Sequence, residues 1–248
     1  MKFENTRVYG MERALYGMRN PKESYHLSDT EYGIEFFDNI MSDAVILFES
    51  NGFCEYIKIG PNDMDLCKRL IKSGSEHRKF LRQIMVSVDI TAPLFWWKEF
   101  DTYKIGTVAN STSTMHTLEK SSITLENFEI DDLKDFECTN FLTGEKSNHL
   151  KAFIEPLIHT LENLRQKYLE TKDKKYWKEL IRWLPESWLQ TRTVTMTYEN
   201  LFAMCSRGQR RFHKLNEWSG IDDDTLDNFI SWARTLPYAQ EFLFIDEI

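Results

Sequence analysis

The sequence has little of what marks membrane or secreted proteins. Its 248 residues include 10 Gly, 6 Pro and 4 Cys. No stretch approaches the roughly 18 apolar residues of a membrane helix, and the N-terminus lacks the apolar run of a signal peptide. We therefore expect a cytoplasmic protein that contacts no membrane.

Residue spacings typical of metal and redox sites are also missing. Cys54, Cys67, Cys138 and Cys205 lie far apart, as free thiols of a reducing compartment do. The six histidines show no metal-ligand spacing, and no GxGxxG, Walker, HExxH or GxSxG motif occurs. The sequence therefore predicts no metal site.

Positive charge is in the minority. The chain has 31 Lys and Arg residues against 39 Asp and Glu residues, which gives a net charge of -8. Binding to duplex nucleic acid depends on a basic face that releases counterions from the phosphates. We therefore expect no duplex nucleic acid as a partner, although a local basic patch could still bind a small anion.

The composition favours a packed fold. Hydrophobic residues make up 42% of the chain and aromatic residues 14%. No Pro-, Gly- or Ser-rich linker interrupts it, so residues 1–248 are predicted to form a single domain. The predicted strands lie near residues 43–48, 54–59, 84–91 and 191–197, and the main predicted helices near 150–171 and 223–236. Because the connections are too short for parallel crossovers, we expect an α/β (α+β) fold with a mainly antiparallel sheet packed by helices.

Three local signals refine this expectation. Asn51-Gly52 predicts a hairpin turn between the first two strands, in a loop of more than two residues. Asn62 or Asp63 is predicted to cap a helix that ends at Gly74. Pro93 is expected in the first turn of an aromatic helix.

Several segments occur in an informative order. They are Ala92-Pro93-Leu94-Phe95, Tyr103-Lys104-Ile105-Gly106-Thr107, Asn110 to Thr114, and Leu184-Pro185 before a strand and an Arg-rich helix. This arrangement resembles the flavin-dependent thymidylate synthases, the ThyX family, over roughly residues 62–116 and 150–218. The resemblance implies a ThyX-like fold, FAD as cofactor, dUMP as the nucleotide, and a homotetramer whose sites are shared between chains.

The family signature, Arg-His-Arg-x-x-Ser-x-Asn-x-x-Ser-x-Arg-Tyr, is only partly kept. Its first Arg and His fall on Thr102 and Tyr103, and its next Arg falls on Lys104. Its two serines fall on Thr107 and Thr112, which keep a hydroxyl. The segment therefore keeps its hydroxyl groups and one of its positive charges.

Two further family positions have changed. A histidine of the family falls on Gln83, and an arginine of the downstream helix falls on Gly208, with Arg207, Arg210 and Arg211 nearby. The resemblance implies that such arginines and histidines hold the flavin phosphates and grip dUMP. A threonine cannot replace a bidentate guanidinium, so the lost charges bear directly on activity.

The predicted ligand site combines two parts of the chain. The segment TVANSTS, residues 107–113, is either a phosphate- or base-binding loop or a polar surface loop. The arginines after residue 206 form either an anion-recognition patch or a solvated helix end. The predicted ligand-binding residues are Lys104, Thr107, Asn110, Thr112, Ser113, Thr114, Arg192, Arg207, Arg210 and Arg211. No catalytic residue is assigned.

These observations support more than one function. The first hypothesis is a divergent flavin-dependent thymidylate synthase-like protein that acts on or binds a pyrimidine nucleotide, with flavin as the carrier of hydride or one-carbon chemistry. The second is a catalytically inactive relative that binds, senses or sequesters a small nucleotide. A purely structural or interaction role is the third. The order of the segments favours the first hypothesis, whereas the lost charges favour the second.

Overall fold

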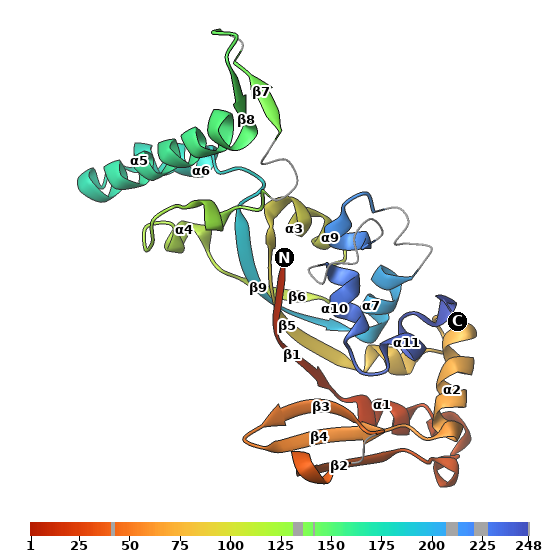
Figure 1. Ribbon diagram of the computed structural model, residues 1–248. Coiled ribbons are helices and arrows are strands. Elements are labelled where there is room, and N and C mark those ends of the chain that lie inside the picture. Colours follow the sequence, from red (N-terminus) through yellow and green to blue (C-terminus); the bar gives the residue numbers. More distant parts are fainter. Residues whose placement is uncertain (41–42, 131–135, 141, 207–212, 221–227, 248) are drawn as a thin grey trace. The chain divides into compact units, whose positions relative to one another are not determined.

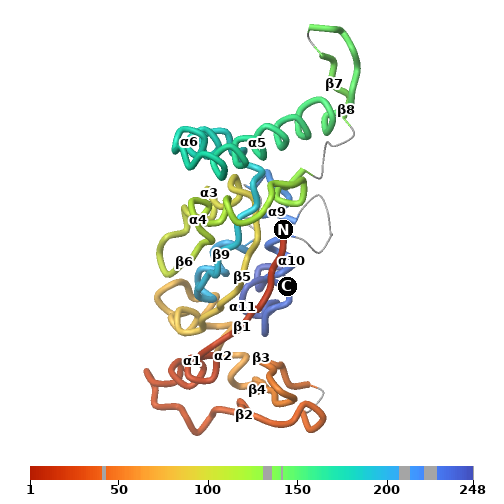
Figure 2. The backbone as a smooth tube through the Cα atoms, turned by 90° about the vertical axis from the view of Figure 1, so that its left-hand side faces the viewer, coloured from red at the N-terminus to blue at the C-terminus, as the bar shows by residue number. Residues whose placement is uncertain are grey.

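A computed structural model gives the structure of residues 1–248 (Figures 1 and 2). It describes all residues except 41–42, 131–135, 141, 207–212, 221–227 and 248. The chain divides into two compact units: unit 1 comprises Met1–Ile90, Thr102–Asn110 and Thr193–Ile248, and unit 2 comprises Thr91–Asp101 and Ser111–Arg192. The single domain over residues 1–248 stays a prediction.

A four-stranded sheet has the strand order β1-β5-β9-β6. Its strands are β1 (Lys2–Tyr9), β5 (Met85–Pro93), β9 (Leu189–Thr197) and β6 (Val108–Ser111). The side-chain hydrogen bonds Asp89–Thr193 and Thr91–Thr191 join β5 and β9 in opposite chain directions, so these strands are antiparallel. The predicted strands near 84–91 and 191–197 are confirmed. Strand β5 continues through Pro93, which precedes the aromatic helix with extended backbone rather than lying in its first turn.

A three-stranded antiparallel sheet in unit 1 has the order β2-β4-β3. Its strands are β2 (Glu31–Phe36), β3 (Val45–Ser50) and β4 (Phe53–Lys58). Asn51 and Gly52 have φ angles of 52° and 79°, the left-handed conformation that a tight hairpin turn requires. The predicted hairpin is confirmed, but its loop has only two residues because Ser50 and Phe53 already pair.

Among the described residues of unit 1, helices precede, connect and follow these strands along the chain. They are α1 (Met11–Gly17), α2 (Pro61–Lys72), α7 (Tyr198–Cys205), α9 (Asn216–Ser219), α10 (Phe229–Arg234) and α11 (Ala239–Phe242). Helix α2 ends where predicted, just before Gly74, which has a φ of 104°. Of the helix predicted near 223–236, the structure shows α10, and residues 221–227 lie outside the described residues.

The N-terminus of α2 is capped by a distant residue. Gly60 precedes the helix, so the predicted caps Asn62 and Asp63 are wrong. The Asp29 carboxylate instead accepts the backbone N–H groups of Asn62 and Asp63 at 2.8 and 3.0 Å, which satisfies two otherwise unpaired donors. A side chain at Gly60 would collide with Asp29, which explains the glycine.

The described part of unit 2 consists mainly of helices and also contains short strands. Its helices are α3 (Leu94–Phe100), α4 (Thr114–Thr117), a π-helical turn η6 (Leu150–Ile154), α5 (Glu155–Thr171) and α6 (Lys174–Arg182). The helix predicted near 150–171 is thus found as η6 and α5. Helices α5 and α6 pack against each other (Figure 2). A short antiparallel pair is formed by β7 (Glu137–Thr139) and β8 (Lys146–Asn148). The unit's core contains Leu118, Ile123, Phe128, Leu161 and Leu180.

Short 3-10 helices connect several of these elements. They are η1 (Asn20–Lys22), η2 (Tyr25–Leu27), η3 (Phe37–Asn39), η4 (Lys79–Arg82), η5 (Leu125–Asn127) and η7 (Ile245–Glu247). Among them, η1, η2 and η4 border the cavity described below.

An ion pair on α5 ties that helix to the preceding segment. Both oxygens of Glu162 accept from the Arg165 guanidinium at 2.8 Å, and Glu162 also accepts the backbone N–H of Ile123 at 2.8 Å. The Arg165 hydrogen bonds, with smaller contributions from Ile123 and Gln166, lower the pKa of Glu162 from 4.5 to about 2, although partial burial opposes the shift. Glu162 is therefore ionised at neutral pH.

This pKa shift predicts the acid sensitivity of unit 2. Because the folded-state pKa lies below the unfolded value, the stabilisation is complete above pH 4.5 and is lost as the pH falls towards 2. Over that range, the free energy of unfolding of the wild type, measured in urea titrations, should fall by about 2 kcal/mol more than that of the Glu162→Gln variant. Glu155→Gln, an exposed position on the same helix, should behave as the wild type; equal acid sensitivity in all three proteins would contradict the assignment.

Candidate functional site

The first group of predicted ligand residues lies in the segment Thr102–Asn110 of unit 1. Lys104 and Asn110 are exposed, whereas Thr107 is half-buried and its hydroxyl donates to the carbonyl of Tyr103. Residues 108–111 form β6, so the prediction of a loop over 107–113 is wrong for them. The small polar side chains of this segment favoured a loop, but backbone hydrogen bonds to β9 make it a strand.

The start of α7 holds this segment in place. Thr197 and Asn200 form a capping box, and Asn200 Nδ2 donates to the carbonyl of Ile105 at 2.6 Å. Gly106, with a φ of 78°, lies directly beside the Asn200 side chain. The sequence interpretation missed Asn200, although a Thr followed three residues later by a polar side chain is a known helix-start signal.

An aromatic cluster occurs where the family signature has its histidine. The Tyr103 hydroxyl lies 3.2 Å from His213 Nε2, and the His213 ring stacks on Trp218 with 4.9 Å between centroids. This packing places a phenol rather than a basic side chain at a position where the resemblance implies a group that binds an anion.

The second group of predicted ligand residues lies in unit 2. Thr112 and Ser113 are exposed, and Thr114 begins α4. Thr112 is fixed to β9, because its N–H donates to the carbonyl of Thr191 at 2.9 Å and its own carbonyl accepts from Gln190. The structure therefore brings Thr112 next to the strand that carries Arg192.

Arg192 is already engaged within unit 2. Its guanidinium lies 4.2 Å from the centre of the Trp97 ring, donates to Asp101 at 2.8 Å and donates to Gln190 at 3.0 Å. Its side chain is 15% exposed. Asp101 neutralises the charge, so Arg192 can bind an anion only by giving up or sharing that partner.

The ten predicted ligand residues are thus not shown as one site. Lys104, Thr107 and Asn110 belong to unit 1, and Thr112, Ser113, Thr114 and Arg192 belong to unit 2. Arg207, Arg210 and Arg211 lie outside the described residues. A ligand site built from all of them stays a prediction.

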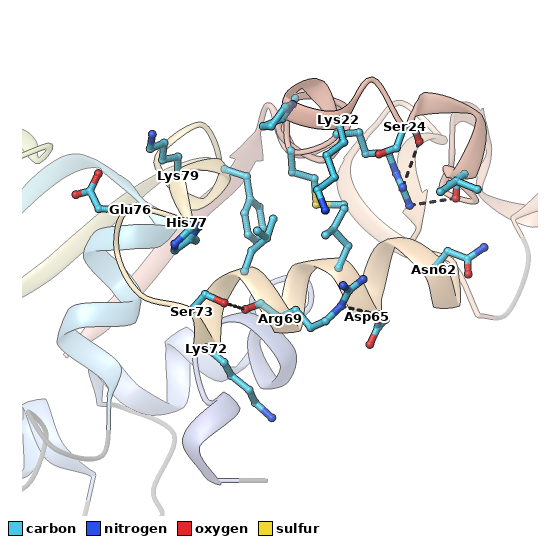
Figure 3. Close-up of a pocket in the computed structure, with 18 of the residues that line it drawn as sticks. Lys22, Ser24, Asn62, Asp65, Arg69, Lys72, Ser73, Glu76, His77 and Lys79 are labelled. Atoms are coloured by element: carbon cyan, nitrogen blue, oxygen red, sulfur yellow. Dashed lines mark hydrogen bonds and ion pairs between the residues drawn. The ribbon is translucent and has the colours of Figure 1, made fainter.

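The structure shows a cavity that the sequence did not predict. It has a volume of about 1340 Å³ and lies within unit 1, bordered by η1, η2, α2 and η4 (Figure 3). Apolar side chains line part of it, among them Met18, Leu66, Leu70 and Phe80. A cavity of this size with an apolar wall can accommodate a ring-bearing ligand such as a nucleotide.

The rim of the cavity is basic although the protein as a whole is acidic. The charged lining residues are Arg19, Lys22, Arg69, Lys72 and Lys79, with Asp65 and Glu76 as the carboxylates. Arg69 pairs with Asp65 at 2.8 Å. Among the described residues, Lys22, Lys72 and Lys79 have no ion pair, so they remain available to an anion. Figure 3 shows Lys22 extending from η1 towards α2.

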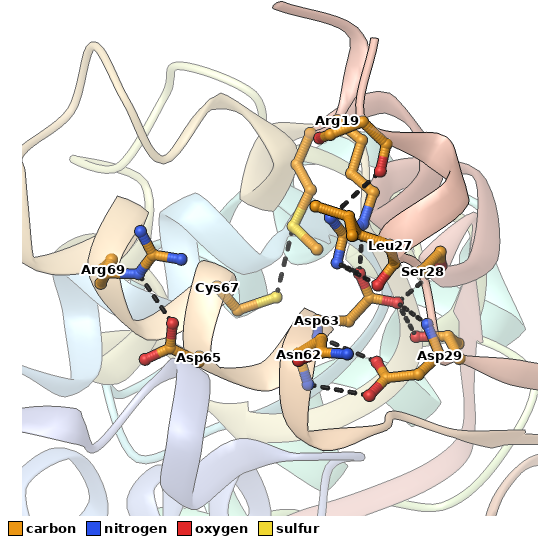
Figure 4. Close-up of polar contacts among 12 residues, drawn as sticks. Arg19, Leu27, Ser28, Asp29, Asn62, Asp63, Asp65, Cys67 and Arg69 are labelled. Carbon is orange, nitrogen blue, oxygen red and sulfur yellow. Dashed lines mark hydrogen bonds and ion pairs between the residues drawn. The ribbon is translucent and has the colours of Figure 1, made fainter. Parts of the chain in front are cut away.

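A buried ion pair fixes one wall of the cavity (Figure 4). Arg19 is 4% exposed and Asp63 is fully buried. Arg19 Nε donates to Asp63 Oδ1 at 2.6 Å, and the other guanidinium nitrogens donate to the carbonyls of Ser24 and Leu27. The ion pair therefore fastens the segment with η1 and η2 to α2. These elements line the cavity, so the ion pair helps to keep its walls in place.

The second oxygen of Asp63 is equally well satisfied. It accepts from the Ser28 hydroxyl at 2.7 Å, the Thr30 hydroxyl at 2.6 Å and the backbone N–H of Asp29 at 3.2 Å. Burial raises the pKa of Asp63, but the hydrogen bonds from Thr30, Ser28 and Arg19 outweigh burial and leave the pKa below its usual value. Asp63 is therefore a structural anion, and Arg19 is not free to bind a ligand.

The cavity also includes one position that the family resemblance identified. Gln83 lines it and lies beside Gly17, where an added Cβ would be 3.2 Å from Gln83 Oε1. Gln83 falls where the resemblance implies a histidine. The lysines of the rim were not predicted because they lie on three separate elements, η1, α2 and η4, which only the fold brings together.

No cluster of His, Cys, Asp or Glu that could hold a metal ion occurs within the described ranges. In the same part of the chain, no helix combines the length and apolar character needed to cross a membrane. Cys54, Cys67, Cys138 and Cys205 are all free thiols.

No family model matches the sequence, and no curated protein matches it. Solved structures do match. Thymidylate synthase X (ThyX) from Helicobacter pylori, solved with FAD and dUMP, has a TM-score of 0.62 and 16% identity, with 99% of this chain and 98% of that chain covered.

Two further structures agree with this result. Another structure of the flavin-dependent thymidylate synthase from Helicobacter pylori, complexed with FAD and dUMP, has a TM-score of 0.59 and 17% identity, with 99% of both chains covered. The UMP/dUMP methylase PolB from Streptomyces cacaoi, bound with 5-Br dUMP, has a TM-score of 0.55 and 12% identity, covering 99% of this chain and 94% of that one. The resemblance to ThyX and the predicted α+β fold are thereby confirmed at the level of the fold.

The buried ion pair predicts a large effect of one substitution on α2. Asp63→Ala leaves the Arg19 charge buried without its partner, so the free energy of unfolding should fall by about 3–5 kcal/mol in urea titrations. Asp65→Ala is the matched control, because it removes an exposed ion pair two residues further along the same helix and should cost less than about 1 kcal/mol. Similar losses in both variants would contradict the structural role of Asp63.

Proposed function

We propose that this chain binds a pyrimidine nucleotide in the cavity of unit 1. The observation that carries the proposal is the combination of an apolar wall with the unpaired cations Lys22, Lys72 and Lys79 in a protein of net charge -8. The apolar wall suits the faces of a base, and the ammonium groups suit a phosphate. Since Arg19 is held by Asp63, these lysines are the groups that would bind the anion.

The fold supports a pyrimidine nucleotide rather than another anion. The ThyX structures of the same fold were solved with dUMP, and PolB was solved with 5-Br dUMP. Gln83 adds support from within this chain, since an amide can donate to and accept from the polar edge of a base. The predicted ligand residues around Lys104 offer a second location for the same ligand.

We also propose FAD as the cofactor, in line with the ThyX neighbours solved with it. The cavity is large enough for a dinucleotide, and the cations of its rim match a pyrophosphate. When bound, the flavin would supply hydride or one-carbon chemistry. In this cavity the flavin would take the place of the pyrimidine nucleotide: Lys22, Lys72 and Lys79 would hold its phosphate groups, and Leu66 and Leu70 would exclude water from the adjoining wall.

One observation favours a second candidate, a catalytically inactive relative that binds, senses or sequesters a nucleotide. Arg192 is occupied by Asp101 and Trp97, and the signature positions 102 and 103 carry Thr and Tyr. Without guanidinium groups, stabilisation of charge that develops on a reacting nucleotide is weak. By analogy with the ThyX structures, we further propose a homotetramer, which light scattering on the purified protein would test, and a cytoplasmic location, which fractionation of the cells would test.

The proposed cavity predicts which lysines matter for binding. Calorimetric titration of the wild type with dUMP, UMP and FAD should show binding of at least one of them. Lys22→Ala and Lys79→Ala should each weaken that binding by about 1–3 kcal/mol, because each removes a charge-assisted hydrogen bond. Lys151→Ala, which removes an exposed positive charge from unit 2, is the control and should change nothing.

The same titration separates the two locations. If Lys104→Ala and Arg210→Ala weaken binding while Lys22→Ala and Lys79→Ala do not, the ligand lies at the Lys104 segment and the cavity assignment is wrong. If none of these ligands binds the wild type, the proposed function itself is wrong.

The visible spectrum of the purified protein tests the cofactor. A bound flavin absorbs visible light, and the chromophore released by denaturation can be identified as FAD. We expect a yellow protein, or a colourless one that turns yellow after incubation with FAD and gel filtration. A protein that stays colourless after this treatment but binds dUMP would support the inactive relative.

A further inference from the structure

Strand β2 has an open edge. In the order β2-β4-β3 it pairs only with β4, and no other strand of the described chain lies on its free side. Figure 1 shows it as the outer strand of this sheet. An open edge presents unpaired backbone N–H and C=O groups, which can hydrogen-bond to another extended chain.

The side chains of β2 have a regular pattern at this edge. Tyr32, Ile34 and Phe36 share one face and are 44%, 65% and 54% exposed, which is unusual for large apolar residues in a row. Phe53 on β4 extends this face, since its ring centroid lies 4.1 Å from that of Phe36. The opposite face of β2 carries Glu31, Gly33 and Glu35.

The charge around the sheet indicates what could cover it. Residues 31–58 contain six carboxylates and one lysine, and Lys58 is already paired with Asp43 at 2.8 Å. Two copies of the chain joined through β2 would bring these carboxylates together, which opposes such a dimer. A strand with basic residues opposite Glu31 and Glu35 would be attracted instead.

We propose that the free edge of β2 binds an extended segment of a partner protein in which basic and apolar residues alternate. The segment adds a fourth strand to the sheet. Its apolar side chains lie opposite Tyr32, Ile34 and Phe36, and its Lys or Arg side chains lie opposite Glu31 and Glu35. This surface is separate from the residues that line the nucleotide cavity, so the proposal does not depend on the proposed function.

The experiment uses the full-length protein and a short fluorescein-labelled peptide in which lysine and valine alternate. Fluorescence anisotropy should show saturable binding that weakens at high salt. Glu35→Lys, which replaces attraction by repulsion, should weaken binding by about tenfold. Ile34→Thr should also weaken it, and since Ile34 is 65% exposed the fold should survive. Glu155→Lys makes the same charge change on the exposed surface of α5 and serves as the control.

Two further measurements complete the test. A peptide of the same composition with its lysines in one block should bind more weakly, because only alternation puts all lysines on one face of the added strand. Amide hydrogen exchange in residues 31–36 should slow when the alternating peptide binds. Equal binding of both peptides, equal weakening by Glu155→Lys, no protection of β2, or a dimer that forms through β2 without peptide would each overturn the proposal.

Discussion

The buried pair of Arg19 and Asp63 is the interaction on which the candidate site depends. An ionised group with no access to water is tolerated only when its hydrogen-bonding capacity is met. Here Asp63 accepts from Arg19, Ser28, Thr30 and the backbone of Asp29. The pair therefore forces the segment with η1 and η2 to follow one path over α2, and the cavity lies where these elements meet η4. Asp29 strengthens this arrangement by capping α2.

Local sequence signals predicted much of the fold. Alternation predicted β5, since Val86, Val88 and Ile90 are buried as expected, and Asn51-Gly52 predicted the hairpin turn. The failures have a common cause. Asp29 caps a helix that begins more than thirty residues later, and β6 is a strand because β9 pairs with it. No strand was predicted over residues 31–36, where β2 carries a glycine that Tyr56 covers from β4. In each case a residue distant in the sequence decides the structure.

The candidate site was even harder to predict from the sequence, because it too depends on residues that are distant in the chain. The sequence predicted Lys104, Thr107 and Arg192 as ligand residues, but the structure shows the Thr107 hydroxyl and the Arg192 guanidinium bound within the protein. The lysines of the cavity could not be predicted, because Lys22, Lys72 and Lys79 lie on separate elements. Among the described residues, Gln83 is the one cavity residue at a position that the family resemblance had identified. The fold resembles that of ThyX, whereas the lysines proposed to bind an anion lie outside the positions of the family signature.

Binding of a pyrimidine nucleotide in the cavity of unit 1 remains the proposal to test. Hydrogen–deuterium exchange of the full-length protein, with and without saturating dUMP, measures the location of binding directly. We expect slower exchange in residues 17–27 and in α2, with no change in α5 and α6. Protection confined to residues 102–117, or no protection anywhere at a concentration that saturates binding, would contradict it.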